Sequence, residues 1–226
     1  MSSTTSTSND TLNATVCASP VAVPVPPYEV QLSENGQFAM SEATRYFQSG
    51  GSVHETVARI SRRLDDIGVP FVVVGGIAMF HHGFRRFTED VDLLVTSADL
   101  ETIHEKLDGL GFVRPFAASK NLRDAANGVK IEFLITGEFP GDGKPKPVAF
   151  PHPNDVFEVR DGIKVLQLPR LIELKLASYM TGKARSKDLG DVEELIRSLK
   201  LSKDLAAQLN PYVATLFIQK WDEING

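Results

Sequence analysis

Hydrophobic positions after residue 50 recur with two different periods, and the period predicts which segments are helical. Four aliphatic residues return every three or four positions, the spacing that gathers side chains on one face of a helix; they are Val53, Val57, Ile60 and Leu64. Ser52 and Glu55 stand where a capping box would start this helix, because the serine can accept from a first-turn N–H while the glutamate reaches back. The pattern therefore predicts an amphipathic helix that begins near residue 52.

Three apolar runs have the character of β-strands. The first is "PFVVV", a continuous run that ends at Gly75 and Gly76 and is followed by a short helix closed by Gly83. The second is "DVDLLV" at residues 90–95. The third is "GVKIEFLI", whose alternation places Glu132 on the face opposite to its apolar side chains.

The rest of the pattern predicts more helices and one hairpin. A Gly/Pro-rich loop covers 137–153, and Arg160-Asp-Gly162 is the turn of a predicted hairpin. Helical periodicity marks four further segments, the last of them interrupted at Pro211; they are 97–109, 169–182, 187–199 and 203–222. The change from mixed to purely helical pattern near residue 168 predicts an α/β body followed by a helical part.

These patterns divide the chain into three parts. Residues 1–37 begin with a segment rich in Ser, Thr, Asn, Ala and Pro that has little to bury, so we expect a disordered tail there. Residues 38–168 form the expected α/β domain. Residues 169–226 form the expected helical C-terminal part, which we place against the cleft of that domain.

The charge of the chain is unevenly distributed. The net charge is −5, but residues 1–44 contain four acids and no Lys or Arg, so the remainder is close to neutral. A near-neutral body does not exclude a polyanionic partner, and it lacks the basic excess that would predict one.

The sequence carries no signal for export or for a membrane. Cys17 is the only cysteine, so no disulfide forms within the chain. No apolar run approaches the roughly 20 residues of a membrane span. The first residues lack the charged and apolar regions of a secretory signal and the arginines of a transit peptide. We therefore expect a cytoplasmic protein without a membrane partner.

Asp90 and Asp92 are the strongest chemical signal in the chain. Residues two apart on a strand share a face, so the two carboxylates point the same way next to the apolar core. They would repel each other and be costly to desolvate unless a divalent cation such as Mg²⁺ lies between them. If the strand with Glu132 is a neighbour, Glu132 joins them as a third ligand or as a general base.

Gly75 and Gly76 supply the second half of a site. A strand that turns directly into a helix presents first-turn N–H groups, which bind phosphate, and a Cβ at that turn would block a close approach. A phosphate cradle and a carboxylate pair separated by one short helix predict chemistry on a nucleoside triphosphate. The alternative for Asp90 and Asp92 is that they simply close the edge of a sheet.

Basic and hydroxyl side chains near these motifs have more than one interpretation. Arg86 can pair with an aspartate or with a phosphate, and Thr88 can bond the loop backbone. Lys175 falls on the apolar stripe of its helix, where it either faces an anion or extends its amine to solvent. Asp188 and Asp191 share a helix face and can form ion pairs with nearby basic groups.

The stretch "GGIAMFHHGFRRFTEDVDLLV" resembles the nucleotidyltransferase superfamily of the DNA polymerase β type, in the form seen in AbiEii-like toxins and small antibiotic nucleotidyltransferases. The later stretch "LPRLIELKLASYMTGKARSKDLGDVEEL" is similar to the helices of the same proteins. The resemblance covers about residues 53–200. It implies a mixed β-sheet flanked by helices, an α/β (α+β) fold with a helical C-terminal extension.

The resemblance also implies roles for individual residues. Asp90, Asp92 and Glu132 would be the catalytic, metal-binding acids, with Glu in place of the more common Asp at the third position. The predicted nucleotide-binding residues are Gly75, Gly76, Arg86, Thr88, Lys175, Lys187 and Asp188.

The implied reaction is Mg²⁺- or Mn²⁺-dependent transfer of a nucleoside monophosphate from an NTP to a hydroxyl, with release of pyrophosphate. The acceptor would be a tRNA 3′ end or a protein side chain, and a toxin-like protein would have a cognate antitoxin. Three alternatives stay open: a small-molecule, antibiotic-type adenylyltransferase, a metal-dependent glycosyltransferase, and a nucleotide-binding protein without turnover. The Gly-Gly turn argues against the glycosyltransferase.

Overall fold

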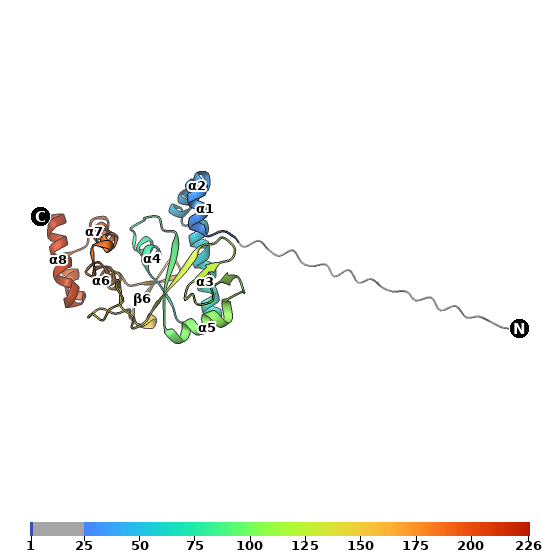
Figure 1. The fold of residues 1–226 in the computed structure, drawn as a ribbon. Coiled ribbons are helices and arrows are strands. Elements are labelled where there is room, and N and C mark those ends of the chain that lie inside the picture. The colour runs from blue at the N-terminus through green and yellow to red at the C-terminus, as the bar shows by residue number, and fades with distance from the viewer. Residues whose placement is uncertain (2–24) are drawn as a thin grey trace.

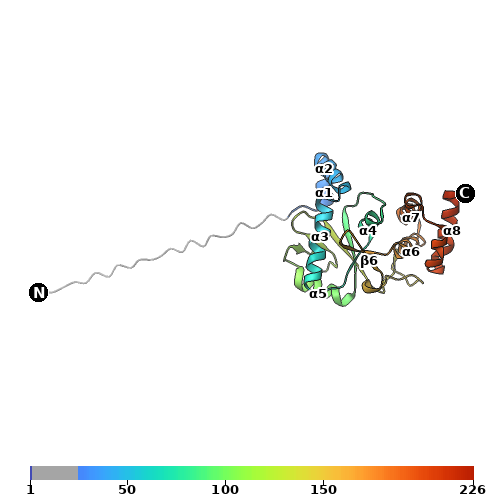
Figure 2. The same ribbon diagram turned by 180° about the vertical axis from the view of Figure 1, so that it is seen from behind.

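A computed structural model of the protein describes Met1 and residues 25–226, and Figures 1 and 2 show the chain from two opposite sides. The first half contains α1 (Tyr28–Glu34), α2 (Gly36–Phe47), α3 (Gly51–Asp66), β1 (Val72–Val73), α4 (Gly75–His82), β2 (Asp90–Val95), α5 (Ser97–Leu107), β3 (Phe112–Val113) and β4 (Leu122–Asp124). The second half contains β5 (Lys130–Ile135), η1 (Pro153–Asp155), β6 (Phe157–Arg160), β7 (Ile163–Leu166), α6 (Leu168–Tyr179), η2 (Lys183–Arg185), α7 (Ser186–Leu199), η3 (Lys203–Gln208) and α8 (Pro211–Asn225).

The strands form one mixed sheet in the order β3-β4-β5-β2-β1-β7-β6. β2 lies between β5, which runs parallel to it, and β1, which runs antiparallel. The predicted mixed sheet flanked by helices is confirmed, and the structure also bears out the hypothesis that residues 90–95 lie beside the strand of Glu132. The two short strands β3 and β4 were not predicted, because two or three residues are too few to show an alternation.

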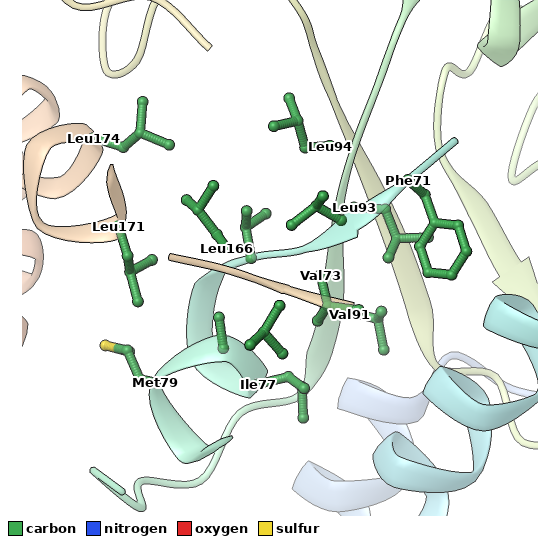
Figure 3. Close-up of a cluster of buried hydrophobic side chains, with 14 of the residues drawn as sticks. Phe71, Val73, Ile77, Met79, Val91, Leu93, Leu94, Leu166, Leu171 and Leu174 are labelled. Carbon is green, nitrogen blue, oxygen red and sulfur yellow. The ribbon is translucent and has the colours of Figure 1, made fainter. Parts of the chain in front are cut away.

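The core lies on both faces of the central strands. Val91, Leu93 and Leu94 of β2 are fully buried because the strand is paired on both sides and covered by helices. In Figure 3, Leu171 and Leu174 point from α6 toward these strands. Figures 1 and 2 show α6, α7 and α8 stacked together at the end of the molecule opposite to α1 and α2.

The N-terminal boundary predicted at residue 38 is wrong. α1 starts at Tyr28, whose ring is fully buried and whose backbone N–H donates to the Gly128 carbonyl. Arg123 anchors α1 through an ion pair with Glu29. Short helices held by long-range contacts lack the periodicity of a longer helix, so the sequence pattern does not reveal them. The predicted tail up to residue 24, including Cys17, lies outside the described residues.

The predicted capping box at Ser52 and Glu55 is also wrong. The Ser52 N–H donates to the buried carboxylate of Glu42 at 2.7 Å, so a residue from α2 takes the place of a local cap. Glu55 instead pairs with Arg45. Burial alone would raise the pKa of Glu42, but hydrogen bonds from Ser52 and Tyr28 and the charge of Arg45 hold it below its usual value. Glu42 therefore joins α1, α2 and α3.

In residues 25–226 no helix is long and apolar enough to cross a membrane.

Candidate active site

The parallel register of β2 and β5 brings the three predicted acids together. Asp92 lies opposite Glu132, and Asp90 lies opposite Lys130, so all four side chains share one face of the sheet. One carboxylate oxygen from each of Asp90, Asp92 and Glu132 lies within 4.8 Å of the others. Hard oxygen donors at this spacing are the ligands that Mg²⁺ and Mn²⁺ take in proteins, so the donor set fits such an ion.

The electrostatics of Asp92 show how crowded this group of acids is. Burial, together with the charges of Asp90 and Glu132, raises the pKa of Asp92 from 3.8 to about 7, against the opposing effect of Lys175 and Lys130. The Lys130 ammonium contacts the Glu132 carboxylate and neutralises part of the charge. A divalent cation would remove the remaining repulsion, which is a second reason why these residues fit a metal.

The side chains packed against the Gly75–Gly76 turn leave no room for a Cβ at either position. The Val74 N–H donates to the Asp92 carbonyl, and Gly75 has a φ of +60° at the first position of α4. A Cβ on Gly75 would lie 1.8 Å from Oδ2 of Asp92, and a Cβ on Gly76 would lie 2.8 Å from the Cβ of Thr88. Glycine is therefore required because the strand with the acids passes directly against the helix start.

A buried ion network closes the other side of the site. Asp191 of α7 is 5 % exposed, and its two oxygens accept hydrogen bonds from the Arg86 guanidinium at 2.8 and 3.0 Å. The Lys175 ammonium donates to the same carboxylate at 2.7 Å and lies 3.4 Å from Asp188. Of the two pairings considered for Arg86, the structure shows the one with an aspartate. Lys175, on the buried side of α6, faces the carboxylates of α7.

Two hydroxyl groups orient carboxylates in the same region. Thr88 Oγ1 donates to Oδ1 of Asp90 at 2.7 Å, so Thr88 holds an acid of the site and not the loop backbone. Ser178 Oγ donates to Oδ2 of Asp188 at 2.7 Å. Each hydroxyl fixes one carboxylate and leaves its other oxygen available for a second partner.

All the catalytic and nucleotide-binding residues predicted from the sequence line one cleft of about 560 Å³ between the sheet, α4, α6 and α7. The predicted residues are Gly75, Gly76, Arg86, Thr88, Asp90, Asp92, Glu132, Lys175, Lys187 and Asp188. Residues that the sequence reasoning did not assign to the site complete the lining; among them are Lys120, Leu134, Phe139, Phe150, Ser178 and Arg185.

Some of the missed residues carried a usable signal. Lys130 is two residues before Glu132, so strand alternation places it on the same face. Ser178 is three residues after Lys175 on one helix, which also puts the two side chains on neighbouring positions. Lys120 and Phe139 lie on loops, and no periodicity predicts where a loop residue points.

Carboxylates on paired strands face a glycine turn at a helix start, a set of groups that fits a divalent cation and a phosphate. The sequence matches the family described as "Nucleotidyl transferase AbiEii toxin, Type IV TA system" over residues 62–223. The chain therefore belongs to the AbiEii family of nucleotidyltransferases, as its motifs predicted. No curated protein matches the sequence. α1, α2 and the first part of α3 precede the matched segment.

The solved structures to which the chain is similar are distant in sequence. ANT(2″)-Ia in complex with adenylyl-2″-tobramycin is 10% identical with a TM-score of 0.45, covering 76% of this chain and 99% of that chain. JHP933 from Helicobacter pylori is 20% identical with a TM-score of 0.40, covering 76% and 78%. An antigenic nucleotidyltransferase-like protein from Paracoccidioides brasiliensis is 16% identical with a TM-score of 0.42, covering 72% and 90%. At these values the likeness carries no argument about substrates.

Gly75→Ala is expected to weaken metal binding by the three acids without unfolding the chain. The added Cβ collides with Asp92, so the carboxylate must move out of the group. We expect the affinity for Mn²⁺ to fall at least about tenfold, measured by calorimetric titration alongside circular dichroism. Gly68→Ala is the matched control, because Gly68 has a similar φ of +70° and its Cβ would meet nothing within 4 Å. Unchanged Mn²⁺ affinity in Gly75→Ala would show that Asp92 is not a ligand.

The raised pKa of Asp92 predicts a pH-dependent loss of stability in the metal-free protein. The pKa of Asp92 is about 7 in the folded protein and 3.8 ordinarily. Between these pH values the carboxyl ionises in the unfolded chain but stays protonated in the folded one, so the free energy of unfolding falls as pH rises. Asp92→Asn removes the penalty. In EDTA at pH 8 we expect it to be more stable than the natural protein by about 1 to 3 kcal/mol, with the gain vanishing toward pH 4.

Urea unfolding at both pH values measures this difference, and Asp66→Asn, at an exposed position, is the control. An Asp92→Asn protein that is no more stable than the natural one at pH 8 would contradict the account of the acids.

Proposed function

We propose that this protein transfers a nucleoside monophosphate from an NTP to a hydroxyl group and releases pyrophosphate. The observation that carries the proposal is the convergence of Asp90, Asp92 and Glu132 opposite the Gly75–Gly76 turn in one cleft. In the reaction the acceptor oxygen forms a bond to the α-phosphorus while the bond from that phosphorus to the β-bridging oxygen breaks. Such an in-line displacement depends on positioning and charge neutralisation, which this cleft is arranged to supply.

Asp90, Asp92 and Glu132 would hold Mg²⁺ or Mn²⁺, which when bound neutralises charge on the triphosphate and polarises its phosphoryl oxygens. The three carboxylates bring excess negative charge to the site, as the raised pKa of Asp92 records. Thr88 keeps the Asp90 carboxylate in place, and the Gly75 turn leaves room for that of Asp92. These supporting contacts are why we assign the acids to metal binding and not to a charged sheet edge.

The triphosphate is proposed to lie at the start of α4. The first-turn N–H groups of Gly75 and Gly76 are donors for phosphate oxygens. Lys175 lies in the same cleft with its charge shared by Asp191 and Asp188, so it can turn one N–H toward a phosphate while keeping the others paired. Two nitrogens of the Arg86 guanidinium donate to the two oxygens of Asp191, so Arg86 has an indirect role: it orients the carboxylate that pairs with Lys175. Lys187 and Asp188 complete the lining on the α7 side.

Glu132 is the proposed acceptor of the proton that leaves the attacking hydroxyl. Its carboxylate lies beside those of Asp90 and Asp92 and contacts the Lys130 ammonium, within reach of a hydroxyl bound in the cleft. One Glu132 oxygen can face the metal while the other faces the hydroxyl. The longer Glu side chain in place of Asp moves this oxygen by about one C–C bond.

The acceptor is proposed to be a hydroxyl of a tRNA 3′ end or of a protein side chain, as membership of a toxin family favours. A cognate antitoxin is then the expected partner, and the cytoplasm, where NTPs and tRNA are found, is the expected compartment. A small-molecule acceptor is the second candidate, because six acidic and five basic residues line the cleft, which therefore has no basic excess for a polyanion. A nucleotide-binding role without turnover is disfavoured by the convergence of all three acids.

The reaction is tested with Mg²⁺, each α-labelled NTP in turn and total tRNA, following pyrophosphate release and label on RNA or protein. We expect label on one macromolecule, with a decrease of at least about 1000-fold in Asp90→Ala/Asp92→Ala, since the acids supply most of the transition-state stabilisation. The exposed Asp65→Ala/Asp66→Ala pair is a matched control.

Pyrophosphate release without label on RNA or protein would favour the small-molecule acceptor. No release with any NTP, despite measurable nucleotide binding, would overturn the proposed reaction in favour of the non-catalytic role.

A further inference from the structure

The cleft has two chemically different parts, and the proposed reaction uses only one of them. The acids, Lys175 and the glycine turn form the polar part. Among the apolar side chains that line the same cleft, four make up what we call the apolar wall: Leu134, Phe139, Phe150 and Leu174. They come from β5, the loop that follows it, and α6. An apolar surface inside a phosphate-handling cleft needs a ligand with an apolar part.

The apolar wall begins directly beside the acids. Leu134 follows Glu132 by two residues on the same face of β5, roughly 6.6 Å further along the strand. On α6, Leu174 lies four residues before Ser178, so the apolar and polar positions follow one another along one helix face. A ligand that bridges the two parts therefore has an anionic end and, a short distance away, an apolar end.

Phe139 is the member of the wall that lies outside the hydrophobic core. Leu134 and Phe150 pack against the hydrophobic core, and Leu174 belongs to it, whereas in the part of the chain that the structure describes Phe139 is neither core nor packed on the core. Its ring is half-buried and stands in a Gly/Pro-rich loop. A half-buried aromatic ring held outside the core is available to a ligand.

The loop that carries Phe139 is held in place and does not depend on a ligand for its shape. The Lys146 ammonium, with a side chain only 7% exposed, donates to the carbonyls of Pro140 and Lys144 at 2.8 and 2.7 Å. It also lies 5.7 Å from the centroid of the Phe139 ring. The Arg185 guanidinium donates to the Gly141 carbonyl at 3.0 Å. These bonds preorganise the ring, so a ligand that stacks on it does not have to order the loop.

We infer that the nucleobase of the NTP stacks on Phe139 while its triphosphate lies at the acids and the Gly75–Gly76 turn. The inference rests on the proposed function and adds the residue that binds the base. Every nucleobase has a flat π-face beside an anionic chain, which matches an aromatic ring at the apolar end of a metal-binding cleft. Phe139 is then the residue through which the protein distinguishes an NTP from a bare polyphosphate.

The test compares two probes on the full chain, both in Mg²⁺: the α,β-methylene analogue of each NTP, and inorganic tripolyphosphate, which has no base. Calorimetric titration of Phe139→Ala is expected to show about 5- to 100-fold weaker binding of the tightest analogue, the range of a base–aromatic contact. Binding of tripolyphosphate should stay within about twofold, and Phe139→Trp should keep the affinity for the analogue.

Phe116→Ala is the matched control, because Phe116 is 65% exposed and does not line the cleft. Equal weakening of both probes in Phe139→Ala would overturn the inference, since Phe139 would then act through the phosphate part of the site. Unchanged binding of both probes would overturn it as well, because the base would bind elsewhere. If the natural protein bound neither probe, the proposed function would fail, and the inference with it.

Discussion

Repulsion among three carboxylates is the constraint on which the rest of this site depends. The in-register parallel pairing of β2 and β5 places Asp92 opposite Glu132, with Asp90 two residues away on the same face. No packing of apolar groups would favour that arrangement, and it raises the pKa of Asp92 to about 7. A cation would relieve the repulsion, so this arrangement of carboxylates favours binding of a metal ion. Lys130, which contacts Glu132, neutralises part of the negative charge.

The surrounding elements act as supports for this group of acids. Gly75 has no side chain because Asp92 occupies the space that a Cβ would fill. Asp191 lies on α7, far along the chain, yet its carboxylate accepts hydrogen bonds from both Arg86 and Lys175. Helices α6 and α7 therefore form part of the cleft, and the side of it that we propose to bind phosphate forms only when they are packed against the sheet.

The sequence was informative where residues close together along the chain form the site. The glycine pair and the Asp90 and Asp92 alternation are local patterns, so both the turn and the shared face could be predicted. The pairing that adds Glu132 was a hypothesis, because strand order depends on contacts across the sheet. Glu42, which replaces the expected cap of α3, and Phe139, which lies in an irregular loop, could not be found from periodicity, since long-range packing and loop geometry decide their positions.

The measurement that tests the central claim most directly is the position of Mn²⁺ located by its anomalous X-ray scattering in crystals grown with an α,β-methylene NTP. The account predicts an anomalous peak within bonding distance of the Asp90 and Asp92 carboxylates, with the triphosphate of the analogue against the Gly75–Gly76 turn. A peak at another group of residues, or an analogue bound away from the acids with no metal beside them, would contradict it.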